Sequence, residues 1–363
     1  MIINEAGEYT LQYTATDACG NSTTVERDLV VEAPPTYRTV LYTDGTFIIN
    51  ESSVDEAANV QAHGQPTNIY PPYDADHPYD FNQSSQYWNS EKSLVLHAEI
   101  GSNISPTVTK YWFGGMTNVV DIDLSKLDTS NVSDMQYMFN SCGSLESIDI
   151  SNFNFQSTTS MRYMFRYCSS LKSIDMSGVT CTNNLDVERM FENCTALEQV
   201  DFTGASMPHI TAIKGLFKNC SVIESVDLSA FRTSAVTSFH EMFANCSAIK
   251  NINFANIDTA NVTTFETMFR YCEAIETIDV SGFNTSSATN MKQMFNFCRA
   301  VKTIYASSNF VTSQVTESTG MFSACSTNLV GGAGTVWSSS YTDKTRAKID
   351  GGVGDEGYFT ARP

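Results

Sequence analysis

MFNSCGSLESIDIS at residues 138–151 recurs as MFRYCSSLKSIDMS at residues 164–177 and as MFENCTALEQVDFT at residues 190–203, which is a period of 26 residues. The phenylalanine of this phrase marks the register, and only its last step is 27 residues long. It stands at Phe113, Phe139, Phe165, Phe191, Phe217, Phe243, Phe269, Phe295 and Phe322. A period this regular predicts a solenoid in which each unit is one turn and neighbouring turns share a continuous core.

Within each unit the pattern predicts a helix followed by a short strand. Met135, Met138, Phe139 and Cys142 have the spacing of one helical face. The LxxIDxS segment that follows is typical of a strand, and the linking stretch LDTSNVSDM offers serine or threonine to cap the next helix. We therefore predict an α/β repeat solenoid with a small β segment at the N-terminus.

Four segments are expected along the chain. Residues 1–32 alternate apolar and polar side chains on both sides of DACGN, which predicts a β-hairpin. Residues 33–110 begin with a proline linker and contain a second hairpin around Asp44-Gly45, and we interpret them as the linker and N-terminal cap. Residues 111–329 form the nine-unit solenoid, and residues 330–363 leave the register and form the C-terminal cap.

The N-terminal hairpin is expected to need a partner, because an isolated two-stranded hairpin is marginally stable in water. It would dock on the rest of the chain, complete a sheet in another subunit, or be the end of a domain that is cut off upstream. The first residues lack the basic and apolar regions of a signal peptide. Either an upstream part is missing, or the protein reaches an external surface without a secretion signal of its own.

The composition narrows the class of partner. The formal net charge of −19 argues against nucleic acid and anionic membranes, because a polyanion is repelled by such a surface. No run of 18 apolar residues is present, so we expect no membrane insertion. The histidines are scattered, without a metalloprotease motif or a nucleophile elbow. We therefore expect no enzyme, no catalytic residues, no metal and no cofactor.

Eight of the ten cysteines stand three residues after a repeated phenylalanine, whereas Cys19 and Cys181 lie outside the register. Stacked strands lie about 4.8 Å apart, so neighbouring thiols could reach disulfide distance. We favour a buried ladder of reduced thiols, because cysteine is among the most buried residue types and behaves as a small apolar side chain. The positions also lack the CxxC and histidine clusters of a zinc site.

Two further ladders are polar. The first stands on the strand, at Asp123, Asp149, Asp175, Asp201, Asp227, Asn253 and Asp279. Either calcium bridges these carboxylates or nearby hydroxyls donate to them; we favour the hydroxyls, because each unit supplies one carboxylate where a calcium loop supplies several. The second alternates in charge, at Glu146, Lys172, Glu198, Glu224, Lys250, Glu276 and Lys302. We expect it to support register more than stability.

The two residues between the repeated phenylalanine and cysteine vary, and we select them as the candidate binding surface. Arg166-Tyr167, Arg270-Tyr271 and Phe297 stand there, and Tyr305 joins them from the strand after Phe297. Arginine and tyrosine often dominate interfaces, and aromatic faces also stack on sugars. Alternatively, these rings only cover the edge of the core.

The combination of MFxxCxxLxxIDxS with DTSNVSDM-like turns resembles the BspA-like leucine-rich-repeat surface proteins of bacteria, over roughly 60% of the chain. This resemblance implies a leucine-rich-repeat-like solenoid with a parallel β-sheet on one face. The turns at residues 180–187 and 207–210 depart from that pattern. The N-terminal hairpin is similar to the end of a bacterial immunoglobulin-like domain. This second resemblance rests on Gly7, Tyr9, Tyr13, Ala15, Asp17, Gly20 and Asn21.

These resemblances imply a non-enzymatic, adhesin-like binding protein at the bacterial cell surface, which recognises a protein or glycan on a cell, matrix or virion through the solenoid face. An alternative is a structural accessory protein of a phage virion, at the virion surface, anchored by strand pairing of residues 1–32 with another chain. The phrase LYTDGTFIINE at residues 41–51 favours the alternative, because it resembles sequences of gut bacteria and their phages. A third possibility is a rigid spacer that presents another domain.

Overall fold

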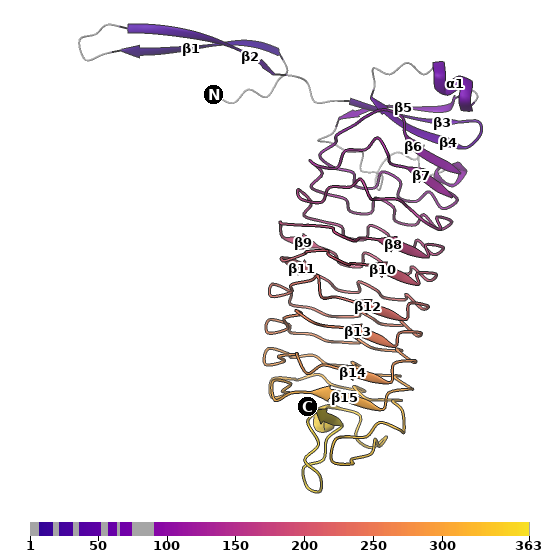
Figure 1. Cartoon of the computed structure of the whole chain (residues 1–363), viewed down its shortest axis with the longest axis vertical. Coiled ribbons are helices and arrows are strands. Elements are labelled where there is room, and N and C mark those ends of the chain that lie inside the picture. The colour runs from indigo at the N-terminus through magenta and orange to yellow at the C-terminus, as the bar shows by residue number, and fades with distance from the viewer. Residues whose placement is uncertain are drawn as a thin grey trace.

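The structure is a computed structural model, and it describes residues 7–16, 22–31, 36–51, 57–63, 66–74 and 91–362. The described chain forms a long stack of coils, with the short strands β8, β10, β12, β13, β14 and β15 following one another along one side (Figure 1). These strands run over Ser173–Asp175, Gln199–Asp201, Ser225–Asp227, Asn251–Asn253, Thr277–Asp279 and Thr303–Ala306. The shorter β9 and β11 run over Leu185–Asp186 and Ile210–Ala212.

The N-terminal hairpin consists of β1 (Gly7–Thr16) and β2 (Ser22–Val31), which form an antiparallel sheet of their own. The hairpin lies apart from the stack in Figure 1. Among the described residues, neither strand pairs with a third strand. Cys19 lies outside the described residues.

A five-stranded sheet precedes the regular coils, in the order β5-β3-β4-β6-β7. The strands β3 (Thr36–Tyr42), β4 (Thr46–Glu51) and β5 (Pro66–Asp74) pair antiparallel, with the helix α1 (Ala57–His63) between the last two. From β4 the pairing turns parallel, through β6 (His97–Ile100) to β7 (Asp121–Asp123), after the 3-10 turn η1 (Lys92–Leu94). The sheet therefore leads from a hairpin into the parallel pairing of the stack.

Successive coils lie in register. Parallel pairing joins β8 to β10, β12 to β13, and β14 to β15. Isolated parallel bridges connect Ser238 to Thr264, Thr264 to Asn290, and Asn290 to Glu317 on another side of the coil. Each bridge spans one repeat, so the prediction of a repeat solenoid with parallel pairing is confirmed.

The predicted α/β class is wrong, because the segment around each repeated phenylalanine is a series of tight turns and not a helix. The amide of Met138 donates to the carbonyl of Met135 (3.2 Å), whereas the next amide, that of Phe139, donates to Met164 in the following coil (2.9 Å). Tyr137 and Ser141 have positive φ angles of 57° and 62°, which a right-handed helix excludes. Among the described residues, α1 is the one α-helix.

The helical spacing of the apolar residues has another cause. Two consecutive four-residue turns bring positions 135, 138, 139 and 142 inward, which is the same spacing as one face of a helix. Half of the amides in this segment bond to the next coil, so the backbone is satisfied without i to i−4 bonds. Carbonyl groups of the neighbouring coil thus accept the hydrogen bonds that carbonyls of the same segment would accept in a helix.

One continuous core runs through the stack, and the repeated phenylalanines form its axis. Neighbouring rings from Phe113 to Phe322 stack with their centroids 5.4–6.2 Å apart. Each cysteine of the register lies beside this column, and its thiol donates to the carbonyl of a phenylalanine in the preceding coil, as Cys168 does to Phe139 at 3.1 Å.

The prediction of a buried ladder of reduced thiols is confirmed for the eight register cysteines, which are all free and buried. Burial raises the pKa of Cys168 to about 12, since the thiolate would lose its hydration. Cys181 is also free and buried. These thiols therefore act as core side chains.

The C-terminal cap covers the last coil. It contains the 3-10 turn η2 (Lys344–Arg346) and the strand β16 (Phe359–Ala361), which pairs parallel with β15. The buried Asp350 holds the cap together, because its carboxylate accepts hydrogen bonds from the amides of Ala333 and Thr335 and from the Thr335 hydroxyl, at 2.8–2.9 Å.

The cap is predicted to weaken in acid through Asp350. Burial alone would raise the pKa of Asp350, but the hydrogen bonds from Thr335, Gly352 and Ala333 outweigh it and hold the pKa well below its ordinary value. Such a carboxylate stabilises the fold fully above its unfolded pKa of about 3.9 and loses this effect as pH falls toward the folded value. Below about pH 4, the denaturant concentration at the midpoint of unfolding should decrease more steeply for the native chain than for Asp350→Asn. Parallel curves in denaturant titrations from pH 7 to pH 2.5 would contradict this role.

Candidate functional site

One side of each coil carries the side chains that stand two residues before, one after and two after the repeated phenylalanine; we call it the turn face. In the coil of Phe165 these residues are Tyr163, Arg166 and Tyr167. Phe165 and Cys168 are buried in the core, whereas Tyr163, Arg166 and Tyr167 point outward. The amide of Tyr167 donates to the carbonyl of Glu192 in the next coil (2.8 Å), which keeps the face in register.

The first aromatic cluster lies at the N-terminal end of the turn face. Tyr111, Tyr137 and Tyr163 stack on one another, with ring centroids 4.4 and 4.7 Å apart. The guanidinium of Arg166 lies 4.5 Å from the Tyr167 ring and 5.2 Å from the Tyr163 ring, within the range of cation–π attraction. Tyr167 is 43% exposed, so the cluster presents an ordered aromatic surface to solvent.

The second aromatic cluster lies on the same face, four coils further on. Arg270 lies 4.8 Å from the Tyr271 ring, which stacks on Phe297 with centroids 4.4 Å apart. Arg299 lies 5.1 Å from the Phe297 ring. Five of the six predicted binding residues therefore lie on the turn face, divided between two clusters that other coils separate.

Tyr305 does not join either cluster. It belongs to β15, and the guanidinium of Arg362 lies 5.1 Å from its ring. Arg362 also pairs with Asp279 on β14 (3.0 Å). The prediction also missed Tyr111, Tyr137 and Tyr163, although the repeated tyrosine two residues before the phenylalanine was a readable signal.

An ion network occupies the turn face between the clusters. Glu192 is 3% exposed and accepts from Arg166 (2.5 Å) and Arg189 (2.8 Å). Arg189 and Lys218 both pair with Glu241, at 3.0 and 2.7 Å. Burial alone would raise the pKa of Glu241, but the Lys218 hydrogen bond and the nearby cations lower it below its ordinary value. The charges of this network therefore pair with one another, and Arg166 connects the network to the first aromatic cluster.

The aspartate ladder is explained by local hydrogen bonds. Asp149 accepts from the amide of Ser151 (2.9 Å), and the hydroxyl and amide of Ser151 lower the pKa of Asp149. The same amide bond recurs at Asp123, Asp175, Asp201, Asp227, Asn253 and Asp279. In the part of the chain that the structure describes, no three acidic, histidine or cysteine side chains are grouped as metal ligands would be.

The alternating charge ladder pairs as expected. Lys172, Lys250 and Lys302 bond to Glu146, Glu224 and Glu276 at 2.5–2.8 Å, and both partners of each pair are more than half exposed. Such exposed pairs contribute about 0–1 kcal/mol each. They assist register and are no candidate site.

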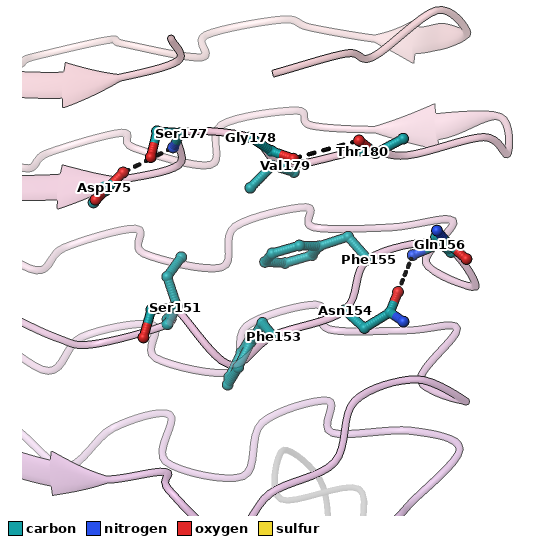
Figure 2. Close-up of a pocket in the computed structure, with 11 residues that line it drawn as sticks. Ser151, Phe153, Asn154, Phe155, Gln156, Asp175, Ser177, Gly178, Val179 and Thr180 are labelled. Atoms are coloured by element: carbon teal, nitrogen blue, oxygen red, sulfur yellow. Dashed lines mark hydrogen bonds between the residues drawn. The ribbon is translucent and has the colours of Figure 1, made fainter. Parts of the chain in front are cut away.

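A cavity of about 540 Å³ opens between the coils that contain residues 150–156 and 175–180 (Figure 2). In four other coils a buried threonine joins this region to the next coil: the Thr129 hydroxyl donates to the Asn154 carbonyl (3.0 Å) and accepts from the Asn154 amide (2.7 Å). Thr233, Thr259 and Thr285 do the same. Phe155 takes the place of this threonine at the cavity, so the bridge is missing there.

Parallel coils in register and one continuous core define a stacked-coil repeat protein. The chain belongs to the family described as Mycoplasma protein of unknown function, DUF285, whose sequence profile matches residues 107–205 and 211–330, more than half of the chain. The break between the two matched segments falls at the turn MPHI, at residues 207–210. No curated protein matches the chain. None of the helices in the described ranges has the length and apolar character to span a bilayer.

Proposed function

We propose that this chain is a non-enzymatic, adhesin-like binding protein of the BspA-like type, exposed at the bacterial cell surface, that recognises a protein or glycan through its turn face. The first aromatic cluster is the observation that carries the proposal. It joins three stacked tyrosines to the exposed Tyr167 by means of Arg166. Tyrosine and arginine are the residue types that most often dominate binding energy at interfaces.

The clusters are suited to binding because they are already ordered. Stacking and cation–π contacts fix the rings of Tyr163 and Tyr167, and the Arg166 guanidinium is held by Glu192. A partner therefore loses little affinity to the ordering of these side chains. The net charge of −19 disfavours the approach of a strongly acidic partner.

The test compares fluorescently labelled protein with a Tyr167→Asn/Tyr271→Asn variant on intact bacteria, matrix proteins and purified phage particles. Asparagine is the natural residue at this position in three coils (Asn193, Asn219 and Asn245), where it has a positive φ angle, so the exchange is compatible with the backbone. We expect saturable binding to cells or matrix, weakened at least tenfold in the variant, about 1.4 kcal/mol or more. Ser141→Asn, at the same position of a coil that has no ring at this position, is the matched control. Saturable binding that the double variant retains in full would contradict the proposal.

A second candidate function is a structural accessory component of a phage virion. The observation that favours it is the hairpin of β1 and β2, whose outer edges pair with no other strand among the described residues. Such edges can add to the sheet of a neighbouring subunit. Binding to phage particles alone, lost on deletion of residues 1–32 and unaffected by Tyr167→Asn/Tyr271→Asn, would favour this function. If changes across the whole exposed face left every interaction intact, a spacer role would be favoured instead.

A further inference from the structure

The cavity between residues 150–156 and 175–180 exposes main-chain groups that pair with each other elsewhere. One coil further on, the Met176 amide donates to the Asp201 carbonyl and the Gly178 amide to the Thr203 carbonyl, both at 2.9 Å. The corresponding amides are those of Ile150, which lines the cavity, and of Asn152, which follows the lining residue Ser151 in the chain. No hydrogen bond joins residues 150–155 to residues 175–181 in the structure. One wall therefore offers donors and the other offers acceptors.

The gap is closed at both ends. The Lys172 amide donates to the Glu146 carbonyl (3.0 Å) before it, and the Asn183 side-chain amide donates to the Gln156 carbonyl (2.9 Å) after it. An extended peptide that filled the gap could not continue beyond it, because the two coils are hydrogen-bonded to each other at both ends. The opening is therefore suited to a compact ligand, and its volume of about 540 Å³ lies within the usual range for small-molecule sites.

The side chains of the cavity combine an apolar floor, which includes the buried ring of Phe155, with a polar rim. Figure 2 shows the Phe155 ring in the space between the two coils, with Phe153 beside Ser151 below it and Val179 above. Asn154, Gln156 and Asp175 line the same space. One oxygen of the Asp175 carboxylate accepts from the Ser177 amide (2.8 Å), and the other has no partner among the described residues.

We propose that this cavity binds a neutral saccharide. A pyranose ring presents an apolar face of C–H groups, which suits the partly exposed side chains of Phe153 and Val179, and an edge of hydroxyls. Each hydroxyl both donates and accepts, so it can serve the amides on one wall and the carbonyls and Asp175 on the other. No lysine or arginine lines the cavity, and Asp175 would repel an acidic sugar. This proposal is independent of the turn face, and it stands or falls separately.

The test uses ligand-observed NMR and calorimetry with the full chain. The probes are the methyl pyranosides of glucose, galactose, mannose and N-acetylglucosamine and their disaccharides, with the methyl glycoside of N-acetylneuraminic acid as the acidic probe. Phe155→Thr restores the residue that joins the coils elsewhere, and its hydroxyl would bridge the main chain of Thr180 as Thr129 bridges Asn154. We expect this variant to lose binding of the neutral probes and Asp175→Asn to bind them at least tenfold more weakly.

Controls separate this site from the turn face and from misfolding. Val222→Ala, at an exposed position outside both the cavity and the turn face, should leave saccharide affinity unchanged. Loss of saccharide binding in Tyr167→Asn but not in Phe155→Thr or Asp175→Asn would assign that binding to the turn face and overturn the proposal. Circular dichroism and cooperative unfolding establish that each variant is folded; should Phe155→Thr fail to fold, Asp175→Asn carries the test, since asparagine still accepts the Ser177 amide. Binding of no neutral probe, preferential binding of the acidic probe, or affinity that is unchanged in the folded variants would each overturn the proposal.

Discussion

Phe217→Ala is expected to lower the free energy of unfolding by about 3–5 kcal/mol. Phe217 is fully buried, and its ring stacks between those of Phe191 and Phe243, with centroids 5.4 and 5.7 Å away. The truncation removes contacts on both faces of the ring at once. The cavity cannot collapse easily, because the hydrogen bonds between coils set their spacing.

Denaturant unfolding, followed by circular dichroism and by tyrosine fluorescence, measures this loss. The loss should spread beyond one coil, because a stack is stabilised by interfaces between nearest neighbours. Val222→Ala, at a 41% exposed position in the same coil, is the control and should change stability by no more than about 0.5 kcal/mol. A change below about 1 kcal/mol for Phe217→Ala would contradict the phenylalanine column as the axis of the core.

Glu192→Ala is expected to cost about 3 kcal/mol. The Glu192 carboxylate is almost fully buried and holds the guanidinium groups of Arg166 and Arg189. Removal of this carboxylate leaves two guanidinium cations close together and partly shielded from water. Their desolvation and mutual repulsion destabilise the fold more than the loss of the ion pairs alone. The same change should loosen Arg166 from its aromatic neighbours and so reduce binding through the first aromatic cluster.

Lys172→Ala provides the contrast, since it removes the exposed pair with Glu146 and should cost less than about 1 kcal/mol. The two variants are compared by thermal and denaturant unfolding at low and high salt. The effect of Glu192→Ala should persist in high salt, because buried pairs are screened less than exposed ones. Equal losses for the two variants would mean that the network on the turn face contributes no more than the exposed ladder.

The 26-residue period predicted the stack correctly, because a repeat of phenylalanine and cysteine at fixed positions requires neighbouring units to share one core. The same residues misled the choice of helix. Met135, Met138, Phe139 and Cys142 satisfy both a helical face and two consecutive turns, and only the amide bonds to the next coil decide between them. Those bonds depend on a stacked neighbour, which local sequence patterns do not contain.

The candidate surfaces were predictable in part. Arg166, Tyr167, Arg270, Tyr271 and Phe297 lie on one face, as their common position in the repeat implies. The cavity was not predicted, although Phe155 stands where four other coils have a buried threonine. The sequence does not show that the threonine hydroxyl joins the backbones of two coils, so it does not show that phenylalanine at this position removes that link. Tyr305 was misplaced because strand and turn positions lie on different parts of the coil.

The most direct test of the binding function is an equilibrium titration of the native chain and of Tyr167→Asn/Tyr271→Asn. The titrant is whichever of the bacterial cells or matrix proteins tested above binds the native chain most tightly. If the turn face is the binding surface, the double variant binds at least tenfold more weakly, while Ser141→Asn binds as the native chain does. Equal affinities for all three proteins would show that recognition does not take place through the exposed rings of the turn face.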